Sequence, residues 1–94
     1  MGSAIATVQV DDVGVRVTEW AFEPGTDTGF HTHGMDYVVI LMASGTLTIV
    51  DADGNETTSE LVAGQSYSRA TGVAHNVINR TNEKIVFVEA EHKA

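Results

Sequence analysis

Short strand-like stretches follow one another along this chain, some of them alternating and others, such as residues 37–42, apolar throughout, and no stretch repeats apolar residues at helical spacing. The stretches are rich in β-branched residues and recur at intervals of about ten residues, with a turn signal after each. They predict strands at residues 5–10, 15–22, 30–33, 37–42, 46–51, 57–62, 66–70, 75–80 and 85–91. The pattern therefore predicts an all-β fold, an antiparallel sandwich or barrel.

The residues between these stretches have the chemistry of turns. Asp53 and Gly54 separate two alternating runs, and the glycine supplies the positive φ that a tight hairpin needs. Pro24 also falls in a turn, where it removes no hydrogen bond from a sheet. With 94 residues and neither a linker nor an internal repeat, the chain is expected to form one domain over residues 1–94.

Composition and charge narrow the range of partners. Five Lys and Arg residues against 13 Asp and Glu residues give a net charge of −8, which argues against binding to nucleic acid or to an anionic membrane surface. The chain has no cysteine, so it forms no disulfides and offers no thiolate chemistry. Its first residues lack the basic and apolar segments of a signal peptide, and a cytoplasmic location is expected.

Two histidines stand one residue apart at the entrance to the most hydrophobic run of the chain. In a strand, side chains at positions i and i+2 point to the same face, about 6.6 Å apart along the strand. His31 and His33 can therefore reach one metal ion together. Taken alone, the pair is equally compatible with two half-exposed strand residues.

A third histidine, His75, begins a later predicted strand and alternates there with Val77 and Asn79. A histidine on an inward face is ordinarily a packed core residue. Because His31 and His33 are also expected to face inward, His75 is more readily interpreted as a third metal ligand. His92 lies among charged residues near the end of the sequence and is expected to be solvated.

The spacing of glycines and histidines in these two blocks follows a known pattern. Gly25, His31, His33 and Gly45 fit one motif, and Gly64, Gly72, His75 and Asn79 fit a second, in which Ala70 replaces a proline. In this respect the chain resembles a small single-domain cupin, a metal-binding β-barrel. The resemblance implies a single antiparallel jelly-roll β-barrel (RmlC-like).

The chain departs from the cupin pattern at one position. Counting back from Gly45 places the family's ligand glutamate at Val38, which cannot bind a metal. The resemblance then implies one divalent transition metal ion (Fe, Zn, Ni or Mn) on His31, His33 and His75. Three neutral imidazoles leave the double charge of the ion unbalanced, so the site is expected to favour an anionic ligand and to keep coordination positions open.

Several neighbouring residues are candidates for the surroundings of the metal. Asp36 is a candidate for direct ligation, for a hydrogen bond to a ligand, or for plain solvation of a loop. Arg69 is a candidate partner for a substrate carboxylate, although a surface strand position explains it equally well. The residues expected to line or pack the pocket are Tyr37, Val38, Ile40, Met42, Leu47, Ile49, Tyr67 and Asn79.

These observations lead to two hypotheses of function. In the first, the chain is a mononuclear metal enzyme that acts on a small, anionic molecule by dioxygenase, isomerase or lyase chemistry. In the alternative, the barrel binds or senses a small ligand without catalysis. In either case a homodimer is expected, with Tyr37, Val39 and Leu41 as the outward apolar row that forms its interface.

Overall fold

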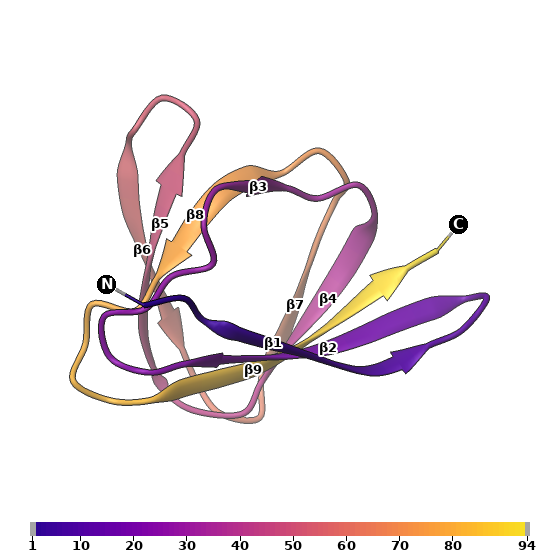
Figure 1. Ribbon diagram of the computed structural model, residues 1–94, viewed down its shortest axis with the longest axis horizontal. Coiled ribbons are helices and arrows are strands. Elements are labelled where there is room, and N and C mark those ends of the chain that lie inside the picture. Colours follow the sequence, from indigo (N-terminus) through magenta and orange to yellow (C-terminus); the bar gives the residue numbers. More distant parts are fainter. Residues whose placement is uncertain (1, 94) are drawn as a thin grey trace.

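The computed structural model describes residues 2–93 and arranges them as two antiparallel sheets that face each other around an open-ended barrel (Figure 1). One sheet has the order β1-β2-β9-β4-β7, and the other has the order β3-β8-β5-β6. The strands are β1 (Ile5–Asp11), β2 (Val15–Phe22), β3 (His31–Thr32), β4 (Asp36–Leu41), β5 (Gly45–Asp51), β6 (Glu56–Leu61), β7 (Ser66–Arg69), β8 (Ala74–Ile78) and β9 (Ile85–His92). The all-β jelly-roll class predicted from the sequence is confirmed.

The hairpin turn predicted at Asp53 and Gly54 is present. The Asp53-Gly54 turn joins β5 to β6, and Gly54 has a φ of 84°, the region that glycine enters without strain. The Asp51 carboxylate closes this turn by accepting hydrogen bonds from the backbone N–H groups of Asp53 and Asn55. Within the described residues, no helix is long and apolar enough to cross a membrane.

The core lies between the two sheets, on one face of each. Alternation is clearest in β4 and β9, where every second side chain is buried. Burying these apolar side chains is the main force that holds the sheets together. The buried core consists of Phe22, Tyr37, Val39, Leu41, Leu47, Leu61, Val77, Ile85 and Phe87.

The inward and outward faces of β4 are the reverse of the prediction. Val38, Ile40 and Met42 were expected to line the barrel, but they are 41%, 39% and 59% exposed on its outside. Tyr37, Val39 and Leu41 were expected to face outward, but they are buried in the core. Both rows are apolar, so hydrophobicity alone does not fix the phase, and a shift of one residue turns every side chain to the other face.

Candidate metal centre

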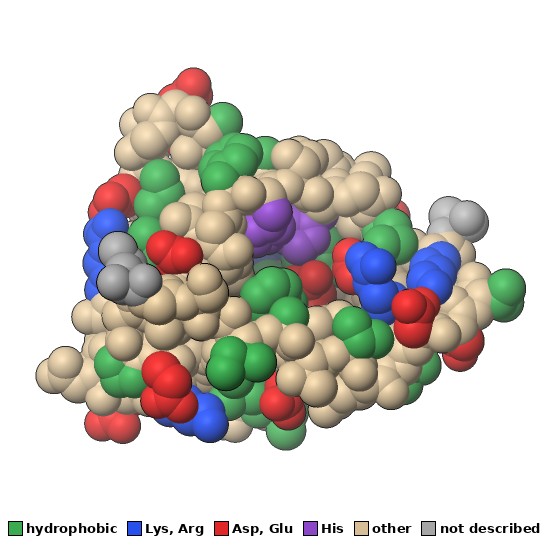
Figure 2. All heavy atoms as spheres, viewed as in Figure 1, with side chains coloured by type: hydrophobic (Ala, Val, Ile, Leu, Met, Phe, Trp, Pro, Cys, Tyr) green, Lys and Arg blue, Asp and Glu red, His purple; other side chains and the backbone are tan. Residues whose placement is uncertain are grey.

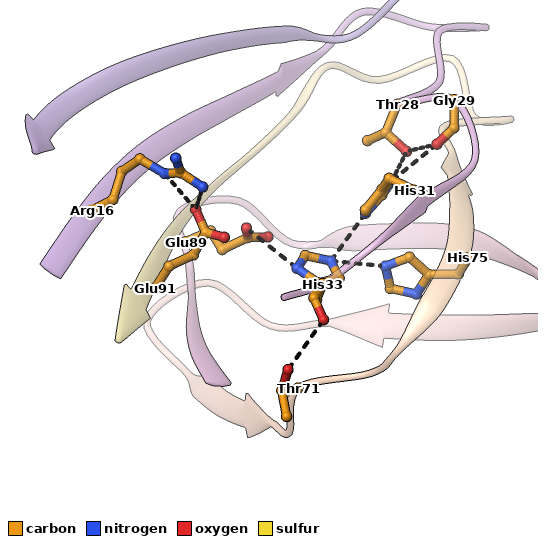
Figure 3. A network of polar contacts seen from close by, with 9 residues as sticks. All are labelled: Arg16, Thr28, Gly29, His31, His33, Thr71, His75, Glu89 and Glu91. Atoms are coloured by element: carbon orange, nitrogen blue, oxygen red, sulfur yellow. Dashed lines mark hydrogen bonds and ion pairs between the residues drawn. The ribbon is translucent and has the colours of Figure 1, made fainter. Parts of the chain in front are cut away.

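The fold brings His31, His33 and His75 together at one end of the barrel. His31 on β3 and His75 on β8 are direct cross-strand partners, and His33 follows β3 immediately. The Nε2 atom of His33 lies 3.0 Å from Nε2 of His31 and 3.3 Å from Nε2 of His75 (Figure 3). Side chains that are far apart in the sequence therefore present the same nitrogen to one small volume.

The separations of these three nitrogens are compatible with a shared metal ion. Ligand atoms at about 2.0–2.1 Å from a tetrahedral zinc ion lie about 3.3 Å from one another. Without a cation or a proton between them, Nε2 lone pairs at 3.0 Å repel each other. The donor set of three imidazole nitrogens suits zinc, iron, nickel or copper.

The surroundings of His31 fix its tautomer. Its Nδ1 atom lies 2.9 Å from the carbonyl oxygen of Gly29, and a carbonyl only accepts, so Nδ1 carries the proton. The Nε2 lone pair is thereby left free to face His33. The hydroxyl of Thr28 lies 3.3 Å from the same Nδ1 and accepts a hydrogen bond from the backbone N–H of Val77, which holds this hydroxyl in place. A metal-ligating histidine commonly has such partners behind it.

The other two histidines are held in the neutral form at pH 7. Burial, followed by the positive charges of neighbouring histidines and of Arg69, lowers the pKa of His75 to about 4. Burial is also the main cause that lowers the pKa of His33. Neutral imidazole is the form that binds a metal, so both rings keep a lone pair available at neutral pH.

Two buried glutamates of β9 lie beside the histidines, and neither is among the site residues predicted from the sequence. Glu89 and Glu91 are each 7% exposed, and a carboxylate oxygen of Glu89 lies 3.9 Å from Nδ1 of His33. Glu91 pairs with Arg16 at 2.8 Å (Figure 3). Burial, and then the charge of Glu91, raises the pKa of Glu89 to about 7. The signal was present in the sequence, because the two glutamates share the period of two with Ile85 and Phe87.

Tyr37 occupies the inward position of β4 next to the histidines, and Val38 points away from them. The Tyr37 ring stacks on the His33 ring with centroids 3.9 Å apart and planes 21° apart. The cupin pattern places a ligand glutamate at this point of β4. The side chain that faces the histidines here is the aromatic ring of Tyr37. Chiefly through burial, the pKa of Tyr37 rises to about 12, so its hydroxyl stays protonated at neutral pH.

Three of the sequence candidates lie away from the histidine cluster. The exposed carboxylate of Asp36 accepts a hydrogen bond from the backbone N–H of Thr71 at 2.7 Å, and it does not belong to the histidine group. Val38 lies on the outer face of the sheet and Met42 is exposed directly after β4, so the prediction that they line the pocket is wrong.

Asn79, also a candidate pocket residue from the sequence, is completely buried. Its side chain forms hydrogen bonds with Phe22, Thr81 and Glu83. Its Nδ2 group donates to the carbonyl oxygens of Phe22 and Glu83, and its Oδ1 atom accepts from Thr81. These bonds tie the end of β2 to the turn before β9. Asn79 therefore acts in the packing of the barrel and touches none of the three imidazoles.

The cavity between the sheets reaches the histidines and opens in two directions. One opening is bordered by Arg16, Met35, Glu89 and Glu91, and Figure 2 shows the histidines at the bottom of a hollow with acidic side chains beside them. The second opening is bordered by residues of β4, β6 and β7 and by His75. Tyr67 and Arg69, both sequence candidates, line this second opening.

Comparison with known proteins agrees with this architecture. A family model described as "Cupin domain" matches residues 18–91. The "Beta-alanine degradation protein BauB" of Pseudomonas aeruginosa is 52% identical over 90 residues, which cover 96% of this chain and 94% of that protein.

Solved structures give the same result. The crystal structure of a cupin domain from Bordetella pertussis is 52% identical, with a TM-score of 0.95 over 99% of this chain and 96% of that one. A double-stranded β-helix protein from Klebsiella pneumoniae is 23% identical, with a TM-score of 0.79 over 97% of this chain and 77% of that one. At this lower identity the likeness concerns the fold alone.

Proposed function

Because this chain belongs to the cupin domain family, which its residues 18–91 match, we propose that it is a metal-dependent protein acting on a small anionic molecule. One divalent transition metal ion binds to His31, His33 and His75 in this proposal. The observation that carries it is the convergence of the three Nε2 atoms, with separations of 3.0 and 3.3 Å along the row. The buried, neutral state of His33 and His75 supports it.

A metal in this site would act as a Lewis acid, or as a redox centre if it is iron, on a ligand that reaches its open positions. The chain contributes the shape and polarity of the cavity around it. His31 is oriented from behind by Gly29 and Thr28, and His33 is held by the stacked ring of Tyr37. Apolar side chains such as Val39 and Phe87 line the interior and limit the water that reaches it.

The relative in Pseudomonas aeruginosa suggests a chemical setting for this activity. That protein carries the name "Beta-alanine degradation protein", and its sequence matches nearly the whole of this chain. We therefore place the activity of this chain in the breakdown of β-alanine or a similar short acid, by dioxygenase, isomerase or lyase chemistry. Short carboxylic acids also suit a site whose three neutral ligands leave the charge of the ion unbalanced.

Elemental analysis of protein purified without a metal-affinity column tests this proposal. We expect about one transition metal ion per chain. We also expect the protein to convert short carboxylic acids, and mass spectrometry of reactions with and without oxygen measures this conversion. Binding of such acids without conversion would favour the alternative, a sensing or storage barrel. A protein that takes up no iron, zinc, nickel, manganese or copper even after reconstitution would overturn the metal-dependent function.

We also propose that the chain forms a homodimer through the outer face of the five-stranded sheet. Val38 and Ile40 of β4 are exposed there, as is Met42 directly after the strand, and Ile40 lies opposite Val88 of β9. Neighbouring apolar side chains on an exposed sheet face favour burial against a partner.

An Ile40→Asp substitution tests the homodimer because it places a charge in the centre of this face. Wild-type protein is expected to sediment at twice the chain mass of 10.0 kDa, and the variant at the monomer mass. Val13→Asp is the matched control, since Val13 is exposed in the turn between β1 and β2 and should not alter the mass. A wild-type monomer at micromolar concentration would contradict the dimer.

A further inference from the structure

Arg69 differs from the other cationic side chains of this acidic protein. The sequence has five Lys and Arg residues, and four of them form ion pairs with carboxylates: Arg16, Arg80, Lys84 and Lys93. Within residues 2–93, Arg69 has no such carboxylate partner. In a chain with 13 Asp and Glu residues, a guanidinium without a carboxylate partner is available for an anion from outside.

The position of Arg69 is fixed by its neighbours on β7 and β4. Its guanidinium carbon lies 4.3 Å from the centre of the Tyr67 ring, within the range of a cation–π contact. One terminal nitrogen donates to the carbonyl oxygen of Ser68 at 2.9 Å. Arg69 also lies opposite Tyr37 in the register of β4 and β7. A guanidinium has five N–H donors, so a planar pair of donors remains for a ligand.

Arg69 lines the same opening as His75, and that opening contains no carboxylate. Its border consists of Tyr37, Ile49, Thr57, Thr58, Ser59, Tyr67, Arg69, Val73 and His75. Hydroxyl groups and one cation therefore face an incoming molecule on this side.

The opposite opening has the reverse charge. It is bordered by Glu89 and Glu91 against a single cation, Arg16, which is already paired with Glu91 at 2.8 Å. Carboxylates therefore outnumber cations on that side, whereas the opening at Arg69 has a cation and no carboxylate. The electrostatic difference between the two openings directs an anion to the side of Arg69.

We infer that Arg69 is the specificity-determining residue that binds a carboxylate of the substrate at the opening between β6 and β7. This inference rests on the metal centre proposed above, because the other end of the same molecule would reach the ion on His31, His33 and His75. The substrate class is a short-chain acid with two anionic or metal-binding ends. Arg69 fixes one end by a paired hydrogen bond, and Tyr37 and Tyr67 enclose the chain between the ends.

Calorimetric titration of zinc-loaded protein with malonate and with acetate tests this assignment. If the inference is correct, malonate occupies the ion and Arg69 together, whereas acetate occupies only one of them. We expect wild-type protein to bind malonate at least about tenfold more tightly than acetate, and Arg69→Gln to lose this preference with unchanged zinc content and unchanged acetate affinity. Arg69→Lys should retain part of the preference, because it keeps the charge but not the planar pair of donors.

Arg80→Gln is the matched control, since Arg80 is exposed and paired with Glu56 and should leave the malonate preference intact. If Arg69→Gln binds zinc and malonate as the wild-type protein does, the inference about Arg69 is overturned while the metal centre stands. If wild-type protein binds no zinc, the metal centre fails and the role of Arg69 fails with it.

Discussion

His33→Ala is expected to abolish stoichiometric metal binding. The imidazole of His33 is the central member of the set, because its Nε2 atom lies 3.0 Å from that of His31 and 3.3 Å from that of His75. Its removal leaves two imidazoles and no carboxylate in the histidine group. Loss of an outer partner of a metal ligand already costs about 10–100-fold in affinity, so loss of the ligand itself should exceed 100-fold. Competition against a chromophoric chelator measures this change.

Two comparisons separate ligand loss from general damage. His92→Ala should bind metal as the wild-type protein does, because His92 is exposed at the end of β9 and lies outside the cluster. Thermal unfolding of both variants without metal reports whether the barrel remains intact after the Tyr37 ring loses its stacking partner. Metal affinity within tenfold of wild type in a folded His33→Ala variant would contradict the three-histidine centre.

The strands and the pair His31 and His33 could be predicted because each depends on a local pattern. Turn residues mark the strand ends, and runs of β-branched and apolar residues identify β4 and β9 without knowledge of their neighbours. His31 and His33 share a face by the period of two alone. That His75 lies next to His31 could be predicted only from the motif resemblance, because their contact depends on the pairing of β3 with β8.

The phase of β4 could not be predicted from this pattern. The strand has apolar residues on both faces, so either row satisfies the hydrophobic requirement of a core. Pairing with β7 and β9 decides the phase, since Val39 lies opposite Tyr67 on one side and Glu89 on the other. The same error concealed Tyr37 as the neighbour of His33.

The glutamates of β9 were missed for a different reason. Their period shows that Glu89 and Glu91 share the inward face with Ile85 and Phe87, yet an ionised carboxylate is rarely buried without a partner. The partners come from distant segments: Arg16 from β2 for Glu91, and the ring of His33 near Glu89. A buried charge predicted by periodicity should therefore prompt a search for a compensating group elsewhere in the chain.

Asn79→Ala is expected to lower the free energy of unfolding by about 3 kcal/mol, because it leaves several polar groups of the barrel without partners. The Asn79 side chain is 0% exposed and donates to the carbonyl oxygens of Phe22 and Glu83, at 3.0 and 2.8 Å. Its Oδ1 atom accepts hydrogen bonds from the N–H and hydroxyl groups of Thr81. For a domain of this size the loss corresponds to a fall of about 15 °C in Tm, measurable by thermal or urea unfolding.

If Asn79 has only a structural role, the same variant should keep its metal binding. Asn82→Ala, an exposed asparagine in the same turn, should change the free energy of unfolding by less than about 0.5 kcal/mol. Below its lowered Tm, Asn79→Ala should still bind one metal ion per chain, because its bonds reach Phe22, Thr81 and Glu83 and none of the imidazoles. A variant with wild-type stability but weakened metal binding would instead place Asn79 in the metal centre.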